Sequence, residues 1–241
     1  MALQSTTVEY FDQGTCLEGF LAYDNAASMP LATVLIAHAW GGRDEFVRDK
    51  ALKLAELGYA AFALDLYGKG VLGRSVPENS ALMAPFMEDR GLLQRRMTAA
   101  LETVRVQQPV DPENIAAMGF CFGGLCVLDL ARTGADLRGV VSFHGLLGAP
   151  SNTRGNAITA RVLVLHGHDD PMVPAEDIRL LQDELTRAGS DWQFHVYGNT
   201  MHAFTNPVAN DPGFGTAYQP LADWRSWQTM RRFFEECFED R

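Results

Sequence analysis

The chain has 241 residues, of which 47% are hydrophobic and 21% charged, with a formal net charge of −10. This composition is typical of a globular protein with a full core, and its acidity disfavours nucleic acids and anionic membranes as partners. The longest apolar run, Leu31 to Ala39, is about half of what a bilayer crossing needs. With no evident secretory signal and only four cysteines, we expect a cytoplasmic protein with free thiols.

The predicted elements begin with a hairpin over residues 7–23, where apolar and polar residues alternate around a turn at residues 12–14. Short continuous apolar runs follow, as in strands that are covered on both faces. Segments with helical periodicity lie between them. The expected strands are 33–38, 60–66, 115–120, 140–143, 162–166 and 192–197, and the expected helices are 46–57, 82–107, 122–133, 175–188 and 218–238.

This alternation predicts an α/β protein with a mostly parallel sheet and helices on both faces. We expect about eight strands, antiparallel at the N-terminal edge, in one domain over residues 1–241. Two Gly/Pro-rich stretches, 68–80 and 205–220, interrupt the alternation after strand ends. Ligands bind at that edge of such sheets, so both stretches are predicted to be loops that form pocket walls.

A candidate nucleophile, Cys121, lies between an expected strand and an expected helix, in the run Gly119-Phe120-Cys121-Phe122-Gly123. The pattern Gly-x-nucleophile-x-Gly is that of a nucleophile elbow, a sharp strained turn. The amides at the start of the following helix favour a thiolate, which is the reactive form. The alternative is that Cys121 is a buried core residue. Cys126 is interpreted as core.

A thiol nucleophile needs a base and an acid that orients the base, and the elbow pattern orders them nucleophile, acid, histidine. His202 follows the strand 192–197, and two acids, Asp169 and Asp170, follow the strand 162–166. In turns of the form Gly-x-x-Asp-x-x-Val-Pro the acid stands three residues after the glycine, here Gly167. We therefore favour Asp170, with Asp169 as the alternative.

The other histidines have simpler interpretations. His38 and His144 end strands at the same edge and either line the pocket or are structural. His166 and His168 are interpreted as turn residues, and His195 as a packed strand residue. One turn cannot supply a closed ligand shell, so we expect no metal site, and the chemistry requires no cofactor.

These residues resemble the dienelactone hydrolase family (carboxymethylenebutenolidases), from Thr33 to the last helix. The specific segments are 60–67, 119–124, 167–174 and 201–204. The resemblance implies an α/β-hydrolase fold without a large lid domain, and a triad of Cys121, Asp170 and His202. It also implies an oxyanion hole from the backbone amides of Trp40 and Phe122. The pocket residues that we expect are His38, Tyr67, His144, Met172 and Phe204.

Two positions depart from the family's founding enzymes, which carry a glutamate at the position of Ala39 and a substrate-binding arginine at that of Asn206. Without the glutamate, Cys121 should rest as a thiolate beside an imidazolium, unless another carboxylate such as Glu45 replaces it. Without the arginine, neutral esters should be preferred. The alternative is that an arginine elsewhere grips an acidic substrate, the candidates being Arg43, Arg74, Arg90, Arg95 and Arg96.

The sequence thus predicts a hydrolase that cleaves small ester or lactone bonds through a cysteine acyl-enzyme. The alternatives are a thioesterase or general carboxylesterase on the same triad, and a ligand-binding protein of hydrolase fold without turnover. The expected partner is a small-molecule ester or lactone. We expect a monomer or a small homo-oligomer.

Overall fold

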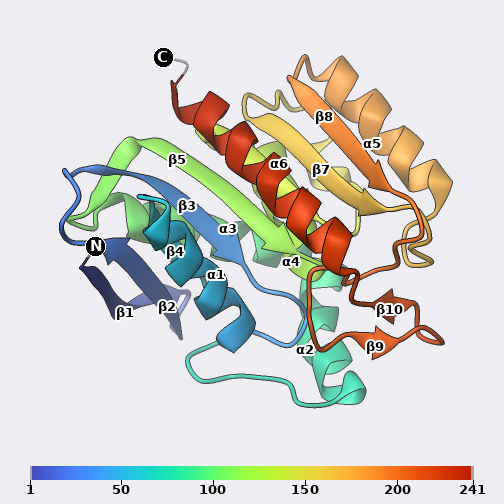
Figure 1. Ribbon diagram of the computed structural model, residues 1–241, viewed down its shortest axis with the longest axis horizontal. Coiled ribbons are helices and arrows are strands. Elements are labelled where there is room, and N and C mark those ends of the chain that lie inside the picture. Colours follow the sequence, from blue (N-terminus) through green and yellow to red (C-terminus); the bar gives the residue numbers. More distant parts are fainter. Residues whose placement is uncertain (1, 240–241) are drawn as a thin grey trace. The chain divides into compact units, whose positions relative to one another are not determined.

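A computed structural model describes residues 2–239 (Figure 1). The chain divides into two compact units, 1–118 and 119–241, and the division falls inside strand β5 (Val110–Phe120). The expectation of a single domain over residues 1–241 stays a prediction. Within residues 2–239, no helix combines the length and the apolarity that a membrane crossing requires.

The first unit contains the N-terminal hairpin, in which β1 (Leu3–Asp12) pairs antiparallel with β2 (Thr15–Asp24). Strand β2 pairs antiparallel with β4 (Ala60–Ala63), and β4 pairs parallel with β3 (Leu31–Ala37). Helix α1 (Glu45–Glu56) packs against these strands. The predicted antiparallel edge is therefore confirmed.

The prediction of one helix over 82–107 is wrong, because the structure has α2 (Val76–Glu88) and α3 (Arg90–Arg105) instead. The break is at Asp89, whose backbone is not helical and whose carboxylate accepts the Leu92 N–H at 3.0 Å, which caps α3. The loop predicted over 68–80 also ends early. Ser75 caps α2 by accepting the Glu78 N–H at 3.3 Å.

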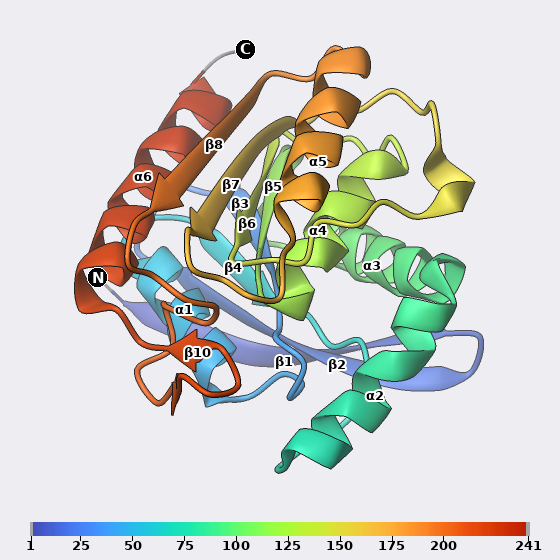
Figure 2. The ribbon, with the colours of Figure 1, turned by 90° about the vertical axis from the view of Figure 1, so that its right-hand side faces the viewer.

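The second unit is built on three parallel strands, paired in the order β6, β7, β8. Figure 2 shows α4 and α5 on one face of these strands and α6 on the other. The stretch 205–220, predicted to be a loop, contains the short antiparallel pair β9 and β10. The elements are β6 (Gly139–Phe143), β7 (Arg161–Gly167), β8 (Trp192–Tyr197), β9 (Asn210–Asp211), β10 (Thr216–Ala217), α4 (Phe122–Arg132), η1 (Ser151–Thr153), α5 (Ala175–Arg187) and α6 (Pro220–Glu239).

Burial explains the continuous apolar runs of the second unit. All of β6 is buried, as are six of the seven residues of β7 and every residue of α4. Since β6, β7 and β8 are parallel, their carboxyl ends share one edge. The loops that follow them, beginning at His144, His168 and Gly198, are therefore brought together at that edge.

Candidate active site

Cys121 occupies a strained turn between β5 and α4, with φ of 56° and ψ of −117°. An L residue rarely adopts such a φ, and its cost is tolerated where the surrounding structure enforces it. The neighbouring glycines are required by packing: a Cβ at Gly119 would lie 2.0 Å from the Gly123 oxygen, and one at Gly124 would lie 2.6 Å from Ser142 Oγ. The glycine pattern in the sequence therefore reflects close backbone packing around a cysteine.

Helix α4 begins directly after this cysteine, at Phe122, and the Cys121 side chain does not cap it by a hydrogen bond. The first turn contains no acidic side chain. The amides at the N-terminus of a helix carry a partial positive charge, so this position stabilises negative charge on the sulfur. Cys121 is partly exposed, whereas Cys126 on the same helix is fully buried.

His202 and Asp170 form a buried hydrogen-bonded pair, in which His202 Nδ1–H donates to Asp170 Oδ2 at 2.7 Å. Their side chains are 1% and 0% exposed. The second carboxylate oxygen of Asp170 accepts the Met172 N–H at 2.9 Å. Asp169 is exposed. Of the two acids that the sequence offered, the structure brings Asp170 to His202.

The loops that carry this pair are held together by their backbones. A Cβ at Gly167 would lie 2.4 Å from the Thr200 oxygen, so only glycine permits this approach of the acid loop to the histidine loop. On its other side, His202 donates its N–H to the Gly215 oxygen at 3.1 Å and accepts the Ala217 N–H at 3.1 Å. The hairpin β9–β10 therefore fixes the backbone of His202.

The charges around His202 favour its protonated form. Burial lowers the pKa of His202, but the charge of the Cys121 thiolate, hydrogen bonds with Asp170 and Cys121, and the charge of Asp170 together raise it to about 10. Nε2 of His202 is buried and has no oxygen or nitrogen partner within residues 2–239. That nitrogen is left to interact with the sulfur or with a substrate.

Three further predicted pocket residues lie in the second unit. His144 is 2% exposed, and its ring meets those of His202 and Phe204 edge to face, with centroids 5.2 and 5.0 Å apart. Phe204 is fully buried, and Met172 is half-buried. The structure therefore packs His144 and Phe204 around the His202 ring, and their role toward a substrate stays a prediction.

The remaining predicted residues lie together in the first unit. His38 is fully buried; its Nδ1–H donates to the Ala39 oxygen at 2.7 Å, and its Nε2 accepts the Leu66 N–H at 3.2 Å. Tyr67 Oη donates to the Trp40 oxygen at 2.9 Å, and the Tyr67 ring centroid lies 4.7 Å from that of His38. His38 thus joins the loops that follow β3 and β4. The assignments of Trp40 and Tyr67 stay predictions.

Asp65 organises the loop after β4, and the sequence analysis did not single it out. Its Oδ1 accepts the amides of Tyr67 at 2.9 Å and Gly68 at 3.1 Å, and its Oδ2 accepts the Glu18 amide at 3.1 Å. An aspartate directly after a buried strand and three residues before a glycine is a recognisable turn signal. The long-range contact to Glu18 has no local signal.

The side chains considered as substitutes for a glutamate at position 39 and an arginine at position 206 already have partners, and so does Asn206. Glu45 is exposed and pairs with Arg48 at 2.6 Å. Arg43 pairs with Glu18 at 2.6 Å. Asn206 Oδ1 accepts the Val208 N–H at 3.2 Å, which closes a local turn. Two of the other arginines, Arg95 and Arg96, contact Asp12 at 3.4 Å each.

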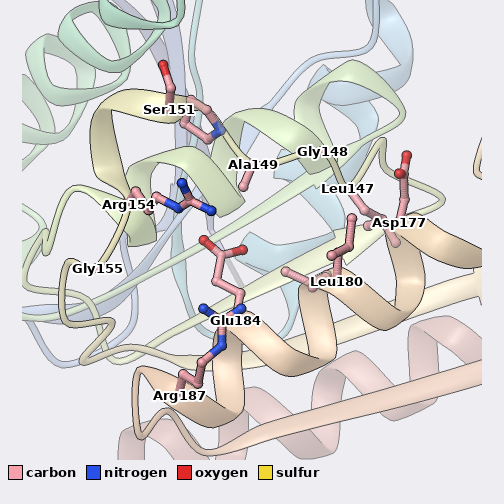
Figure 3. A pocket seen from close by; sticks show the side chains of 12 residues that line it. Leu147, Gly148, Ala149, Ser151, Arg154, Gly155, Asp177, Leu180, Glu184 and Arg187 are labelled. Carbon is pink, nitrogen blue, oxygen red and sulfur yellow. The ribbon is translucent and has the colours of Figure 1, made fainter.

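A cavity of about 440 Å³ lies between the loop 147–155 and α5 (Figure 3). At one end Arg154 and Arg187 flank Glu184, which pairs with the buried Arg132 at 2.8 Å. The lining consists of Leu147, Gly148, Ala149, Pro150, Ser151, Arg154, Gly155, Asp177, Leu180, Leu181, Glu184 and Arg187, and includes neither Cys121 nor His202. Within residues 2–239, no group of His, Cys, Asp or Glu is arranged to hold a metal ion.

Comparison with known proteins gives one consistent family. Residues 17–238 match the model described as the dienelactone hydrolase family. A putative carboxymethylenebutenolidase of Aquifex aeolicus is 26% identical over 235 residues, which cover 95% of this chain and 96% of that protein.

Two solved structures show the same fold as this chain. A dienelactone hydrolase-like promiscuous phosphotriesterase from metagenomic libraries is 38% identical, with a TM-score of 0.94 over 99% of this chain and 100% of that one. An α/β hydrolase from a Medee basin deep-sea metagenome library is 16% identical, with a TM-score of 0.66 over 98% of each chain. The predicted α/β-hydrolase fold is therefore confirmed.

Proposed function

The chain belongs to the dienelactone hydrolase family, whose members hydrolyse ester and lactone bonds, and we propose that it does so through an acyl-enzyme on Cys121. The observation that carries this proposal is the buried Asp170–His202 pair, 2.7 Å apart, with a pKa of His202 that responds to the Cys121 thiolate. The strained turn and the helix N-terminus at Cys121 support it. A base, an acid that orients it and an activated thiol are the parts that nucleophilic catalysis needs.

In the first step, the Cys121 thiolate attacks the carbonyl carbon, and the carbonyl electrons move to oxygen. The resemblance implies the amide of Phe122 as a donor for this oxyanion, and such a donor is typically worth about 3 kcal/mol. Trp40, the second donor that the resemblance implies, remains a prediction. When the C–O bond of the substrate breaks, the leaving oxygen takes the proton from His202, and a thioester remains on Cys121.

The second step follows from the origin of the raised pKa. Acylation removes the thiolate charge, which is the largest of the influences that raise the pKa of His202. The pKa of His202 then falls, and its neutral form can accept a proton from water. The hydroxide equivalent attacks the thioester, the acid is released, and Cys121 and His202 return to the thiolate–imidazolium pair. Asp170 keeps Nδ1 protonated throughout.

The proposed substrates are small neutral esters and lactones. An acidic substrate profits from a bidentate arginine, but position 206 is an asparagine whose oxygen is engaged with Val208. A second candidate activity is hydrolysis of neutral phosphotriesters, because the phosphotriesterase relative is 38% identical over almost the whole chain. There the thiolate would attack phosphorus, the P–O bond to the leaving aryl or alkyl oxygen would break, and this oxygen would take the proton from His202. An S-phosphoryl cysteine would take the place of the thioester.

A matched substrate panel tests this proposal. We would measure kcat/KM for a neutral aryl ester, a neutral lactone, an acidic dienelactone, an acyl thioester and a neutral aryl phosphotriester, with wild type, C121A and the control C126A. We expect the neutral ester to be turned over at least as efficiently as the acidic lactone, and C121A to lose at least about 1,000-fold. Full activity in C121A would refute the nucleophile. A strong thioester preference would favour the thioesterase alternative, and saturable binding without turnover the non-catalytic one.

A further inference from the structure

His144 joins the two halves of the candidate active site. It follows β6 directly, and the Cys121 N–H donates to its Nδ1 at 3.1 Å. On the other side of the ring, Nε2 lies 2.8 Å from Thr205 Oγ1. Thr205 is 1% exposed and stands three residues after His202. One buried ring therefore connects the backbone of the nucleophile with the loop of the base.

The contact with Cys121 determines the tautomer of His144. A backbone N–H can only donate, so Nδ1 must carry a lone pair, and the ring proton is on Nε2. Nε2–H then donates to Thr205 Oγ1. The Cys121 N–H is shared between Nδ1 and the Phe143 oxygen, which lies 3.0 Å away. A doubly protonated His144 would turn an N–H toward this donor and would place a second cation next to His202, 5.2 Å away between ring centroids. Both contacts therefore require a neutral ring.

Backbone strain occurs in the segments that this ring connects. Of the five described non-glycine residues with positive φ, three are Cys121 (56°), His144 itself (38°) and Ala203 (59°), directly after His202. The other two are Gln13 (47°) and Asn199 (51°). Such a conformation is strained in an L residue and persists where surrounding contacts enforce it. The bonds of His144 to the Cys121 amide and to Thr205 are contacts of that kind.

We propose that His144 is a positioning residue that holds the Cys121 turn and the His202 loop at reacting distance by accepting the Cys121 amide and donating to Thr205. This inference rests on the proposed function. The titratable groups that act on His202 are Cys121 and Asp170, and His166 lies near enough to both Asp170 and His202 to respond to their charges. His144, as a neutral ring, fills the space beside His202 without adding charge to this group.

The test separates the two bonds of the ring. His144→Asn keeps an oxygen acceptor near the position of Nδ1, His144→Gln keeps an N–H donor near that of Nε2, and His144→Leu keeps neither. Thr205→Val removes the partner of Nε2–H while leaving the histidine, and Thr205→Ser restores it. His195→Asn, on β8, is the matched histidine control. For each variant we would measure kcat and KM on a neutral ester, and the rate of Cys121 alkylation by iodoacetamide between pH 6 and 9.

The expected result is a loss in kcat of about 10- to 100-fold for His144→Leu, with KM within about threefold. Alkylation of Cys121 at pH 7 should slow in parallel and become more strongly dependent on pH. Thr205→Val should lose less kcat than His144→Leu, and Thr205→Ser should stay within about twofold of wild type. His144→Asn should retain a higher kcat than His144→Leu. If the His144 variants do not fold, the contrast between Thr205→Val and Thr205→Ser still tests the proposal.

Two outcomes would overturn the proposal that His144 is a positioning residue. One is a His144→Leu enzyme whose kcat and alkylation profile stay within twofold of wild type. The other is a rise in KM with an unchanged alkylation profile, which would make His144 a substrate contact. Neither outcome is confused with failure of the proposed function, because that failure appears as full activity in C121A.

Discussion

Two histidines at strand ends, His38 after β3 and His202 after β8, are almost equally buried and have opposite electrostatics. His38 is 0% exposed and uses both ring nitrogens on backbone groups, Ala39 and Leu66. His202 is 1% exposed and uses Nδ1 on Asp170. Burial lowers the pKa of His38, whereas Cys121 and Asp170 overcome burial at His202 and raise its pKa to about 10.

The difference shows that burial alone does not decide the charge of a histidine. A neutral ring satisfied by one carbonyl and one amide loses nothing by staying neutral, and it becomes a structural link between two loops. A ring that faces a carboxylate and a thiolate recovers more from its charge than burial costs. The first arrangement suits packing, and the second suits proton transfer.

The largest expected effect is on kcat and concerns Asp170, the carboxylate that His202 has as a partner and His38 lacks. Asp170→Asn replaces the carboxylate by an amide, which favours the wrong tautomer of His202, and we expect kcat to fall by about 1,000- to 10,000-fold. Asp169→Asn is the matched control, because Asp169 is exposed next to it, and should stay within about twofold. Steady-state kinetics on a neutral ester decides. Equal losses in the two variants would contradict the assignment.

The second-largest expected effect is a loss of stability when His38 is replaced. His38→Leu leaves the Leu66 amide and the Ala39 carbonyl without their buried partner, and we expect the free energy of unfolding to fall by about 1–3 kcal/mol. The pH profile of Cys121 alkylation should stay that of wild type. Urea unfolding and iodoacetamide kinetics on the same variant provide both readings. A stability within about 0.5 kcal/mol of wild type would remove His38 from its structural role.

A third effect is the titration of the two rings, followed by NMR with labelled histidine. His202 should stay an imidazolium up to about pH 10 and lose its proton above that value, whereas His38 should be neutral at pH 7. Cys121→Ala removes the largest influence that raises the pKa of His202, so its titration should move to lower pH by at least about one unit. A His202 titration that is the same in wild type and Cys121→Ala would show that the thiolate and the ring do not interact.

The smallest expected change is in the alkylation of the wild-type enzyme. An isolated thiol with a pKa near 8.5 would react about 25-fold faster at pH 9 than at pH 7. A thiolate held by His202 at rest should speed up by less than about threefold over the same range. A steep rise would mean that Cys121 rests as a thiol, as the founding enzymes of the family achieve with the glutamate that Ala39 replaces here.

Much of the second unit could be predicted because its signals are local. The glycines around Cys121 are needed for close backbone packing, and the spacing from Gly167 selected Asp170 over Asp169. Strand ends in a parallel sheet share one edge, which is why short motifs far apart in the sequence meet.

The failures have a different physical origin. The helical periodicity of 82–107 continues through Asp89, so the break appears only when the Asp89 carboxylate is seen to cap α3. Three hydrogen bonds join segments that are 23 to 61 residues apart. They are the bond between His38 and Leu66 and the two bonds of His144. No local pattern encodes such contacts, and a histidine at a strand end therefore looks the same whether it is structural or part of the catalytic machinery.

Trapping the acyl-enzyme tests the central claim most directly. A slowly hydrolysed aryl ester would be mixed with the enzyme and quenched in acid within one turnover, and the tryptic peptide 106–132 sequenced by mass spectrometry. This peptide contains both Cys121 and the fully buried Cys126, so one spectrum holds its own control. The account predicts the acyl mass on Cys121 and none on Cys126. An acyl group on another residue, or product release from the wild-type enzyme at the normal rate with no adduct on Cys121, would contradict it.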